Sequence, residues 1–342
     1  MQDTTALFRF LDDALGDHAP VTLTPMTGGG SCEVFALERG GERWVLRRAP
    51  AHANTTRAHD VLREHRILVA LENTAVRVPR PIVACADLAV FGTPFYVMTR
   101  VDGVPVRGGI PETWVASPQT QGRAVEELID ALVEVHALDW RAVGLTDLGH
   151  AEGFLERQVE RWLAQLASYG GRDLQAVHDL AGWLDEHRPV GQEPTLFHGD
   201  YKLDNVLFAP TSPPHLLAVV DWEMATIGDP LIDLAWSLIF HPVGGTMPLG
   251  MAGPHTFAIE QLPSADAMVT RYANRSGRDL SAMGWYHVFA RWKGAIVLEG
   301  SHAKWQRGDS VNPVHEWFGR QADKLLSSAA ELVERARSGE TA

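Results

Sequence analysis

One segment of the sequence combines the residue types that phosphoryl transfer requires. It contains the run His198-Gly199-Asp200-Tyr201-Lys202-Leu203-Asp204-Asn205 and, sixteen residues further on and directly behind an apolar run, the triplet Asp221-Trp222-Glu223. Phosphoryl transfer needs a carboxylate that receives the proton of the nucleophile, and oxygen ligands that hold Mg²⁺ on the phosphates. Asp200 and Asn205 are five residues apart on one short loop. If residues 206–208 and 217–220 pair as a hairpin, Asp221 returns to the neighbourhood of Asn205.

These motifs gain their weight as an ordered set. A His-Gly-Asp triplet or an Asp-Trp pair is a weak signal by itself, and each is more often part of ordinary packing. Here both are followed by Gly228-Asp229-Pro230-Leu231-Ile232-Asp233-Leu234, and core packing gives no reason for all three in this order. We therefore interpret the set as catalytic. His198 is expected to be structural, as a hydrogen-bond partner that orients the loop backbone.

The ordered set resembles the catalytic loop and metal motif of protein kinases. Its His-Gly-Asp and Asp-Trp-Glu forms are similar to those of the aminoglycoside phosphotransferase and choline kinase group. This resemblance implies that Asp200 is the catalytic base and that Asn205 and Asp221 hold Mg²⁺. It also implies that ATP is the phosphoryl donor, that Lys202 reaches the transferred phosphate, and that Asp233 braces the catalytic loop.

The nucleotide contacts are expected in a glycine-rich loop between two predicted strands near the N-terminus. The loop residues are Gly28, Gly29, Gly30 and Ser31. Glycines let backbone amides approach phosphates closely, although three glycines by themselves more often mark a turn. The loop is not a P-loop, because no Gly-Lys-Ser/Thr sequence follows. By the resemblance, the carbonyl group of Thr99 and the amide of Val101 would bind the adenine edge.

The sequence departs from the kinase pattern at Arg47, within Trp44-Val45-Leu46-Arg47-Arg48. Kinases carry lysine at this strand position, paired with a glutamate on a helix, and Glu64 is the expected partner here. Arginine binds phosphate in a bidentate way, so we expect Arg47 to contact the nucleotide. Two alternatives stay open. Arg47 and Glu64 are solvated surface residues, or the chain is a nucleotide-binding pseudokinase module that transfers nothing.

The surrounding elements predict an α+β, bilobal protein-kinase-like fold. Apolar spacing and turn signals predict a helix over 5–16, strands over 33–38 and 43–48, a helix over 56–72, and strands near 82–86 and 95–100. Helical spacing dominates from residue 105 onward, at 125–136, 154–166, 284–305 and 313–336. We therefore expect an N-lobe, residues 1–101, with a small antiparallel sheet and one long helix. A large, mainly helical C-lobe, residues 102–342, carries the catalytic loop and the metal site.

The composition narrows the classes of function. The 342 residues are 45% hydrophobic and 21% charged, which predicts a folded protein with a substantial core. A net charge of −13 disfavours nucleic-acid binding, which needs a basic face. Cys32 and Cys85 make no disulfide framework or zinc pattern, the N-terminus does not resemble a signal peptide, and no apolar run suits a membrane span. We expect a cytoplasmic enzyme, and the oligomeric state is left open.

Three segments are similar to the kinase domain fused to some acyl-CoA dehydrogenases, and to its free-standing bacterial relatives. They are Trp44-Val45-Leu46-Arg47-Arg48, the catalytic run from His198 to Asn205, and Trp285-Tyr286-His287-Val288-Phe289-Ala290-Arg291-Trp292-Lys293. This resemblance implies a small-molecule acceptor whose hydroxyl belongs to a hydroxyacyl compound. An aminoglycoside acceptor is the alternative within the same fold.

Charge near the C-terminus favours the acyl acceptor over a polycationic aminoglycoside. Residues 285–307 contain four bases against the single acid Glu299, and the bases are Arg291, Lys293, Lys304 and Arg307. Bases suit a carboxylate or a phosphate of coenzyme A, but they are equally expected as outward-facing helix charges. Four aromatic residues could wall an apolar pocket, although their helical spacing favours core packing. They are Trp285, Tyr286, Trp292 and Trp305.

Overall fold

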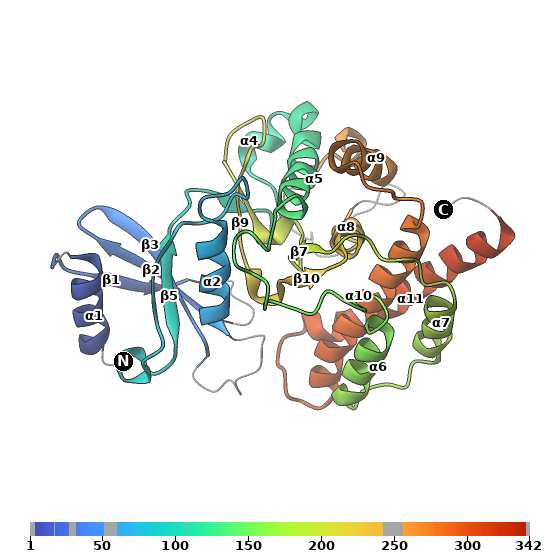
Figure 1. Cartoon of the computed structure of the whole chain (residues 1–342), viewed down its shortest axis with the longest axis horizontal. Helices are drawn as coiled ribbons and strands as arrows, with labels where there is room; N and C mark the ends of the chain where they lie inside the picture. Colours follow the sequence, from blue (N-terminus) through green and yellow to red (C-terminus); the bar gives the residue numbers. More distant parts are fainter. Residues whose placement is uncertain are drawn as a thin grey trace.

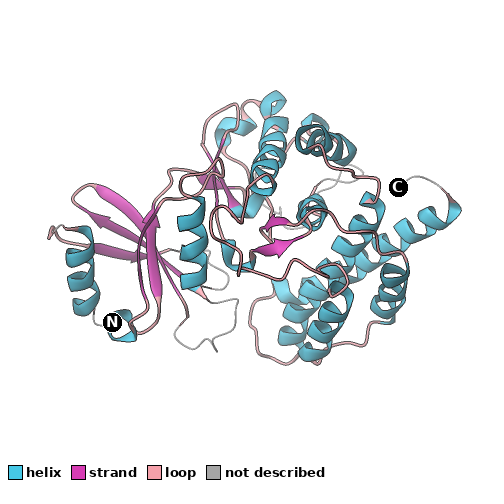
Figure 2. Cartoon of the chain, in the orientation of Figure 1, coloured by secondary structure: helices cyan, strands magenta, loops and turns pink. Residues whose placement is uncertain are grey.

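The computed structural model describes residues 4–16, 18–26, 32–50, 60–107, 109–241 and 256–339. These residues form a smaller and a larger lobe that lie side by side along the longest axis of the molecule (Figure 1). The smaller lobe contains an antiparallel sheet, and the larger lobe is mainly helical (Figure 2). The predicted α+β arrangement is therefore confirmed, whereas the division after residue 101 stays a prediction.

The sheet of the smaller lobe has the strand order β1-β2-β3-β5-β4. Its strands are β1 (Thr22–Pro25), β2 (Glu33–Arg39), β3 (Glu42–Arg48), β4 (Pro81–Cys85) and β5 (Phe95–Thr99). The turn between β2 and β3 is Gly40-Gly41, with φ angles of 57° and 90°. Two-residue hairpin turns need positive φ at such positions, which glycine adopts without steric cost. Because β3 lies in the middle of the sheet, Arg47 is held on a strand that is paired on both sides.

Among the described residues, three helices belong to the smaller lobe, and one of them connects it to the larger lobe. They are α1 (Thr5–Leu15), α2 (Val61–Leu71) and α3 (Leu88–Phe91). The side chain of Asp60 accepts a hydrogen bond from the backbone N–H of Arg63 (3.0 Å) and so caps the start of α2. The predicted start at residue 56 lies outside the described residues. The buried face of α2 packs into the core of the larger lobe and carries Glu64 with it.

The larger lobe contains α4 (Glu112–Val115), α5 (Gly122–His136), α6 (Gln158–Tyr169), α7 (Gln175–Glu186), α8 (Pro230–Leu238), α9 (Ala265–Ser276), α10 (Met283–Gln306) and α11 (Val314–Ser338). The two long C-terminal helices confirm the predictions at 284–305 and 313–336. The prediction of a helix from residue 154 is wrong at its start, because α6 begins at Gln158. The preceding residues form turns, in which Phe154 packs edge-on against Phe197 with ring centroids 5.8 Å apart.

Two short sheets frame the catalytic segment in the larger lobe. In one of them β7 (Thr195–Phe197) pairs with β10 (Thr226–Gly228). In the other, β8 (Val206–Phe208) lies between β6 (Val104–Pro105) and β9 (Leu216–Val219). The predicted hairpin is thus confirmed. The strands β6, β7 and β10 were not predicted, because two or three residues are too few to show an alternating pattern.

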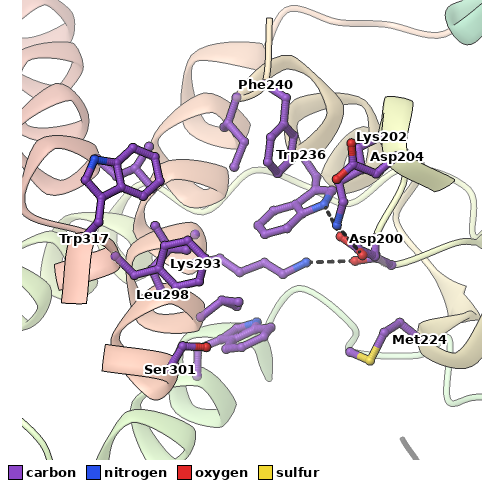
Figure 3. Close-up of a pocket in the computed structure, with 17 residues that line it drawn as sticks. Asp200, Lys202, Asp204, Met224, Trp236, Phe240, Lys293, Leu298, Ser301 and Trp317 are labelled. Carbon is purple, nitrogen blue, oxygen red and sulfur yellow. Dashed lines mark hydrogen bonds and ion pairs between the residues drawn. The ribbon is translucent and has the colours of Figure 1, made fainter. Parts of the chain in front are cut away.

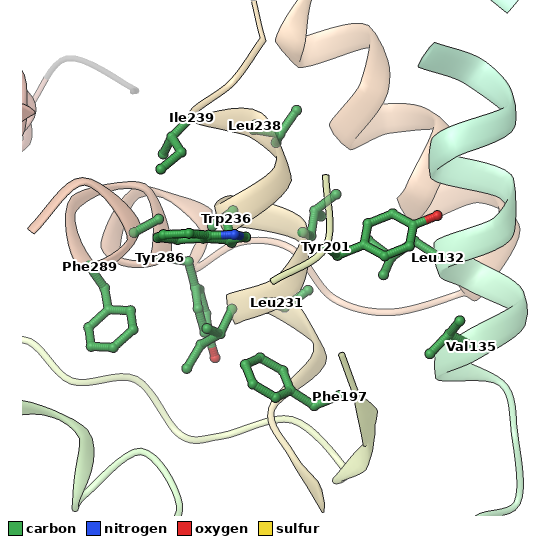
Figure 4. Close-up of a cluster of buried hydrophobic side chains, with 14 of the residues drawn as sticks. Leu132, Val135, Phe197, Tyr201, Leu231, Trp236, Leu238, Ile239, Tyr286 and Phe289 are labelled. Carbon is green, nitrogen blue, oxygen red and sulfur yellow. The ribbon is translucent and has the colours of Figure 1, made fainter. Parts of the chain in front are cut away.

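The catalytic segment is anchored in the hydrophobic core of the larger lobe. Figure 4 shows Tyr201 of that segment beside Leu132 of α5, with Trp236 of α8 nearby. Tyr201 is fully buried, and its hydroxyl donates to the carbonyl oxygen of Leu128 at 2.7 Å. The buried ring anchors the segment through its apolar contacts, and the hydrogen bond of its hydroxyl fixes the orientation of the ring.

Two further expectations concerned the cysteines and the absence of a membrane-spanning segment. Cys32 and Cys85 are both buried and form no disulfide, as predicted. Within the described ranges, no helix combines the length and the apolar character that crossing a membrane requires.

Candidate active site

The catalytic loop, residues 198–205, runs from β7 to β8 and is braced by Asp233 of α8. The two carboxylate oxygens of Asp233 accept hydrogen bonds from the backbone N–H groups of His198 (2.5 Å) and Gly199 (2.9 Å). Asp233 is fully buried, so water does not compete for these bonds. Its position follows from the start of α8, where Asp229 caps the helix and Pro230 begins it. The bracing contact that the resemblance implied is therefore present.

Gly199 allows the loop to turn against the segment that follows Asp221. Its φ is 89°, and a Cβ atom at this position would lie 2.6 Å from the carbonyl oxygen of Met224. Both the backbone angle and the close approach require glycine. The middle residue of the His-Gly-Asp triplet is thus set by packing rather than by chemistry.

His198 is fully buried and serves the loop backbone. Its Nδ1 accepts from the backbone N–H of Asp200 (3.3 Å), so Nε2 carries the hydrogen and donates to the carbonyl oxygen of Val220 (3.0 Å). Both ring nitrogens are therefore occupied by backbone groups. This arrangement matches the structural role expected for His198.

Asp200 presents its carboxylate to a cavity, where Lys202 and Trp236 contact it (Figure 3). Three side chains in all hold its oxygens. Oδ2 accepts from Lys202 Nζ (2.6 Å) and from Asn205 Nδ2 (2.9 Å), and Oδ1 accepts from Trp236 Nε1 (3.0 Å). Burial alone would raise the pKa of Asp200. The ammonium of Lys202 and the hydrogen bonds outweigh burial and lower that pKa below its usual value. Asp200 is therefore an ionised, oriented carboxylate.

Lys202 lies on the same loop as Asp200 and forms an ion pair with it. Its Nζ is also 5.7 Å from the centre of the Phe240 ring. The resemblance implied a contact with the transferred phosphate, and this role stays a prediction. What the structure adds is that Lys202 neutralises the carboxylate beside it.

The hairpin of β8 and β9 brings Asn205 and Asp221 together, as predicted. The backbone N–H of Val220 donates to the carbonyl oxygen of Asn205 (2.9 Å), which places Asp221 next in the chain beside it. Nδ2 of Asn205 donates to Asp200, so these bonds leave its amide oxygen available to a metal. Asp221 has φ 69° and is alone among the described non-glycine residues in adopting a positive φ. Such local strain is concentrated at functional sites.

These oxygen donors fit the hard cation Mg²⁺. Mg²⁺ takes one or two protein ligands and completes its octahedral shell with phosphate oxygens and water. No cluster of three or more His, Cys, Asp or Glu side chains suited to a metal is found in the part of the chain that the structure describes. The described residues therefore do not form a site in which protein side chains supply all the metal ligands. An amide oxygen and one carboxylate instead suit a metal that is also bound by phosphate oxygens.

Arg47 lies at the centre of four side chains that we call the Arg47 cluster: Arg47, Glu64, Asp221 and Glu223. Arg47 Nε is 2.9 Å from Glu64 Oε2, and Nη2 is 2.6 Å from Asp221 Oδ1 and 3.1 Å from Glu223 Oε2. Glu64 also accepts from the backbone N–H of Trp222 (3.1 Å), and its burial raises its pKa although Arg47 opposes the shift. The predicted pair is confirmed, and the surface alternative for both residues is wrong. The contact with the predicted metal ligand Asp221 was not foreseen.

The other predicted nucleotide residues are placed less completely. Gly28, Gly29, Gly30 and Ser31 lie outside the described residues, between the end of β1 and the start of β2. Thr99 ends β5, and its backbone N–H donates to the carbonyl oxygen of Arg80 (2.8 Å). Val101 follows in a segment without helix or strand structure that leads to the larger lobe. Their contacts with adenine stay predictions.

A cavity of about 410 Å³ opens beside Asp200. Its polar lining includes Asp200, Lys202, Asp204, Lys293 and Ser301, and its aromatic lining is Trp162, Trp236, Phe240, Trp317 and Phe318. Most of the remaining lining is aliphatic and comes from α10, from α11 and from Ile239, which directly follows α8. A cavity of this size suits a small organic molecule.

Comparison with known proteins places the chain in a family. The sequence profile of the phosphotransferase enzyme family matches residues 22–268. The chain belongs to that family. It is also 31% identical over 327 residues to acyl-CoA dehydrogenase family member 11 of Rattus norvegicus, a match that covers 94% of this chain and 42% of the rat protein. The phosphotransferase therefore spans less than half the length of that relative.

Solved structures show the same fold. A protein of Ralstonia eutropha, described as a candidate aminoglycoside phosphotransferase, matches with a TM-score of 0.83 and 27% identity, over 98% of this chain and 99% of that one. Choline kinase of Cryptosporidium parvum matches with a TM-score of 0.67 and 12% identity, over 99% and 98%. An aminoglycoside phosphotransferase solved with AMP-PNP and hygromycin B matches at 0.56 and 18%, over 95% and 98%. The kinase-like fold of this phosphotransferase and the resemblance to a domain joined to acyl-CoA dehydrogenases are thus confirmed.

The structure separates the C-terminal bases that the sequence had grouped. Of the four described bases Arg291, Lys293, Lys304 and Arg307, only Lys293 lines the cavity. Arg291 is half-buried and donates to Ser328 of α11 (3.2 Å), while Lys304 and Arg307 are exposed. Helical spacing alone does not show which of these bases faces the cavity, because that depends on which elements pack against each side of α10.

The aromatic residues are separated in the same way. Trp285, Tyr286 and Trp292 are buried in the core, which confirms the packing interpretation for those three. The rings that do line the cavity were not predicted. For Trp236 a signal existed, because it lies three residues after Asp233 on one helix and so one turn away on the same face.

Proposed function

We propose that this phosphotransferase moves the γ-phosphate of ATP, with Mg²⁺, to a hydroxyl of a small molecule. The observation that carries the proposal is the Asp200 carboxylate. It is ionised, its two oxygens are held by Lys202, Asn205 and Trp236, and it faces a cavity of about 410 Å³. A fixed carboxylate at the edge of a small-molecule cavity is what proton removal from an acceptor hydroxyl requires.

In the proposed reaction the acceptor hydroxyl lies in the cavity within reach of Asp200. Asp200 takes the hydroxyl proton as the acceptor oxygen forms its bond to the γ-phosphorus. The bond from that phosphorus to the oxygen it shares with the β-phosphate breaks, and ADP leaves with the electron pair. Lys202 lies beside Asp200, so its ammonium can stabilise the negative charge on the phosphoryl group during transfer.

The metal and the nucleotide would be held by Asn205 and Asp221 together with residues of the smaller lobe. Asn205 and Asp221 would bind Mg²⁺, which neutralises charge on the phosphates when it is bound. Arg47 would contact the phosphates, together with backbone amides of residues 28–31, while Thr99 and Val101 would bind adenine. The related aminoglycoside phosphotransferase solved with AMP-PNP supports ATP as the donor.

For the acceptor we propose a hydroxyacyl compound. The cavity walls are largely aromatic and aliphatic, and Asp200 and Asp204 are the acids among the lining residues. A polycationic aminoglycoside needs more carboxylates than these, whereas an acyl chain suits apolar walls. The name of the rat relative, an acyl-CoA dehydrogenase family member, supports the same class.

The test is transfer of radiolabelled γ-phosphate by the purified protein with MgATP. The acceptor panel contains hydroxy acids, hydroxyacyl-CoA thioesters, amino alcohols and aminoglycosides, and Asp200→Asn serves as the matched control. We expect transfer to hydroxyacyl compounds and a loss of about 100- to 10,000-fold in Asp200→Asn. Full turnover by Asp200→Asn would exclude Asp200 as the base. Transfer to aminoglycosides alone would establish the alternative acceptor.

A pseudokinase module is the second candidate, and the Arg47–Asp221 contact of 2.6 Å favours it. If that contact persists when nucleotide binds, Asp221 cannot serve fully as a metal ligand. This candidate predicts thermal stabilisation by ATP that does not depend on Mg²⁺ and no transfer to any acceptor. Stabilisation that requires Mg²⁺ and is lost in Asp221→Ala would exclude it.

A further inference from the structure

Lys293 is a cation in the cavity wall that the proposed reaction does not use. It projects from α10 toward the catalytic loop (Figure 3), and its Nζ donates to the carbonyl oxygen of Gly199 at 3.2 Å. The same Nζ lies 4.1 Å from the ring centre of Trp236 and 5.4 Å from that of Trp162. Only 5% of the residue is exposed. The ammonium is thus buried near two aromatic rings, and it contacts the residue that precedes Asp200 in the chain.

In the described part of the chain, Asp233 and Asp200 attract the ammonium of Lys293 from a distance, but neither forms an ion pair with it. No carboxylate of the described residues lies within ion-pair distance of it, whereas Lys202 has Asp200 as its partner at 2.6 Å. One carbonyl oxygen satisfies one of the three N–H donors of an ammonium. Burying a cation with so few partners is unfavourable, and burial lowers the pKa of Lys293 to about 8. An anion in the cavity would supply what is missing.

The surroundings of Lys293 indicate which anion would fit. The cavity lining that α10 shares with α11 includes the apolar residues Val297, Leu298 and Leu325, with Ser301 as a neutral polar group. A multiply charged anion would leave most of its charge against these apolar walls. A single carboxylate on an apolar chain matches both the cation and the walls.

We propose that Lys293 is the residue that recognises the acceptor, by binding a carboxylate on an apolar chain whose hydroxyl faces Asp200. The acceptor is then a hydroxy acid, and an amine in place of the carboxylate is rejected by the like charge. This inference rests on the proposed function for the placement of the hydroxyl. It assigns Lys293 a contact with the acceptor rather than a role in holding the loop.

The experiment measures binding by isothermal titration calorimetry. The ligands are matched sets with the same hydroxylated chain that ends in a carboxylate, a primary amide or an amine, with several chain lengths. The variants are Lys293→Gln and Lys293→Met, and Lys304→Gln removes an exposed charge from the same helix as the control. Gln keeps a donor for the Gly199 carbonyl group, and Met keeps only the apolar stem, so the two separate the charge from the loop contact.

We expect the wild type to prefer the carboxylate over the amide by about 10- to 100-fold, the range of one charge-assisted hydrogen bond. Both Lys293 variants should lose this preference and bind the amide as the wild type does, while Lys304→Gln stays unchanged. An equal loss for all three ligands in Lys293→Gln would show a purely structural lysine and overturn the proposal. So would a wild type that binds carboxylate and amide equally at every chain length.

The same ligands keep the two proposals apart. If the wild type binds the hydroxy acid through Lys293 but transfers no phosphate to it, the proposed function fails and the recognition role stands. If it transfers phosphate to amide and acid with the same KM, the function stands and the role of Lys293 fails. A recognition role also predicts that Lys293→Gln raises KM for the acid more than it lowers kcat.

Discussion

The catalytic loop and the Arg47 cluster are two parts of one site that are held in different ways. The loop is fixed by backbone hydrogen bonds to the buried carboxylate of Asp233, and no step of the proposed reaction displaces them. The cluster is held by ion pairs between side chains, and one of these occupies Asp221. From this difference we expect the proposed base to be preorganised, whereas the proposed nucleotide side would exchange contacts on binding MgATP. The following variants test this contrast.

The largest effect is expected from removing the brace of the loop. Asp233→Ala leaves the backbone N–H groups of His198 and Gly199 buried without acceptors, and each such group costs about 1–3 kcal/mol. We expect a loss of roughly 2–6 kcal/mol of unfolding free energy by urea denaturation, together with loss of transfer. Asp233→Asn, which keeps one acceptor oxygen, should lose less, and the exposed control Asp173→Ala should change neither. Full activity in Asp233→Ala would contradict the preorganised loop.

The next largest effect concerns the turn at Gly199. Gly199→Ala combines backbone strain at φ 89° with a Cβ atom 2.6 Å from the carbonyl oxygen of Met224. We expect a loss of about 2–5 kcal/mol by thermal denaturation and a matching loss of activity. Gly308→Ala is the control, because Gly308 has φ 77° but open space around it, so strain alone should cost about 1–2 kcal/mol. Equal losses in the two variants would mean that the close approach does not matter.

The third prediction concerns the stability that Lys293 costs the fold. The pKa of Lys293 falls from 10.5 to about 8 in the folded state, because burial disfavours the ammonium although Asp233 and Asp200 oppose this and Arg161 and Lys202 add to it. The folded state therefore binds fewer protons than the unfolded state between pH 8 and 10.5, and stability rises with pH there. Below pH 8 the penalty is complete and amounts to roughly 1–3 kcal/mol after allowing for the Gly199 contact.

The measurement is the difference in Tm between Lys293→Met and the wild type across pH. Lys293→Met should be the more stable protein at pH 6–7, and its advantage should shrink as pH rises through about 8 toward 10.5. Lys304→Met, an exposed residue of the same helix, should show no such trend. A Lys293→Met variant that is less stable at every pH would mean that the Gly199 contact outweighs the buried charge.

The smallest effect is expected from a substitution in the Arg47 cluster that keeps the charge. Arg47→Lys keeps the charge and restores the kinase residue, but one ammonium cannot contact Glu64, Asp221 and Glu223 with the fork geometry of a guanidinium. We expect a loss of about 1 kcal/mol in stability and less than a tenfold change in KM for ATP. The control is Arg43→Lys on the same strand, whose exposed pair with Asp102 should contribute almost nothing. A large loss in kcat would show that the cluster is as rigid as the loop.

The fold could be predicted where the chain has a clear period. The long helices α5, α10 and α11 and the hairpin of β2 and β3 all show their spacing or their turn residues in the sequence. The strands β6, β7 and β10 could not be found, because two or three residues carry no period and are strands only through pairing with distant segments. The start of α6 was placed too early, because Phe154 and Leu155 continue its apolar spacing but belong to turns.

The sequence by itself determined Asp200, Asn205 and Asp221 as one group, because a short loop and a hairpin leave few ways to place them. Through the kinase resemblance it also predicted Glu64 as the partner of Arg47, with solvated surface positions as the alternative. Only the tertiary structure decided that Arg47 reaches Asp221, that Trp236 holds Asp200, and that Lys293 faces the cavity while its neighbours on α10 do not. These contacts join residues from separate elements, and the side to which a buried charge points depends on what packs around it rather than on its position in the chain.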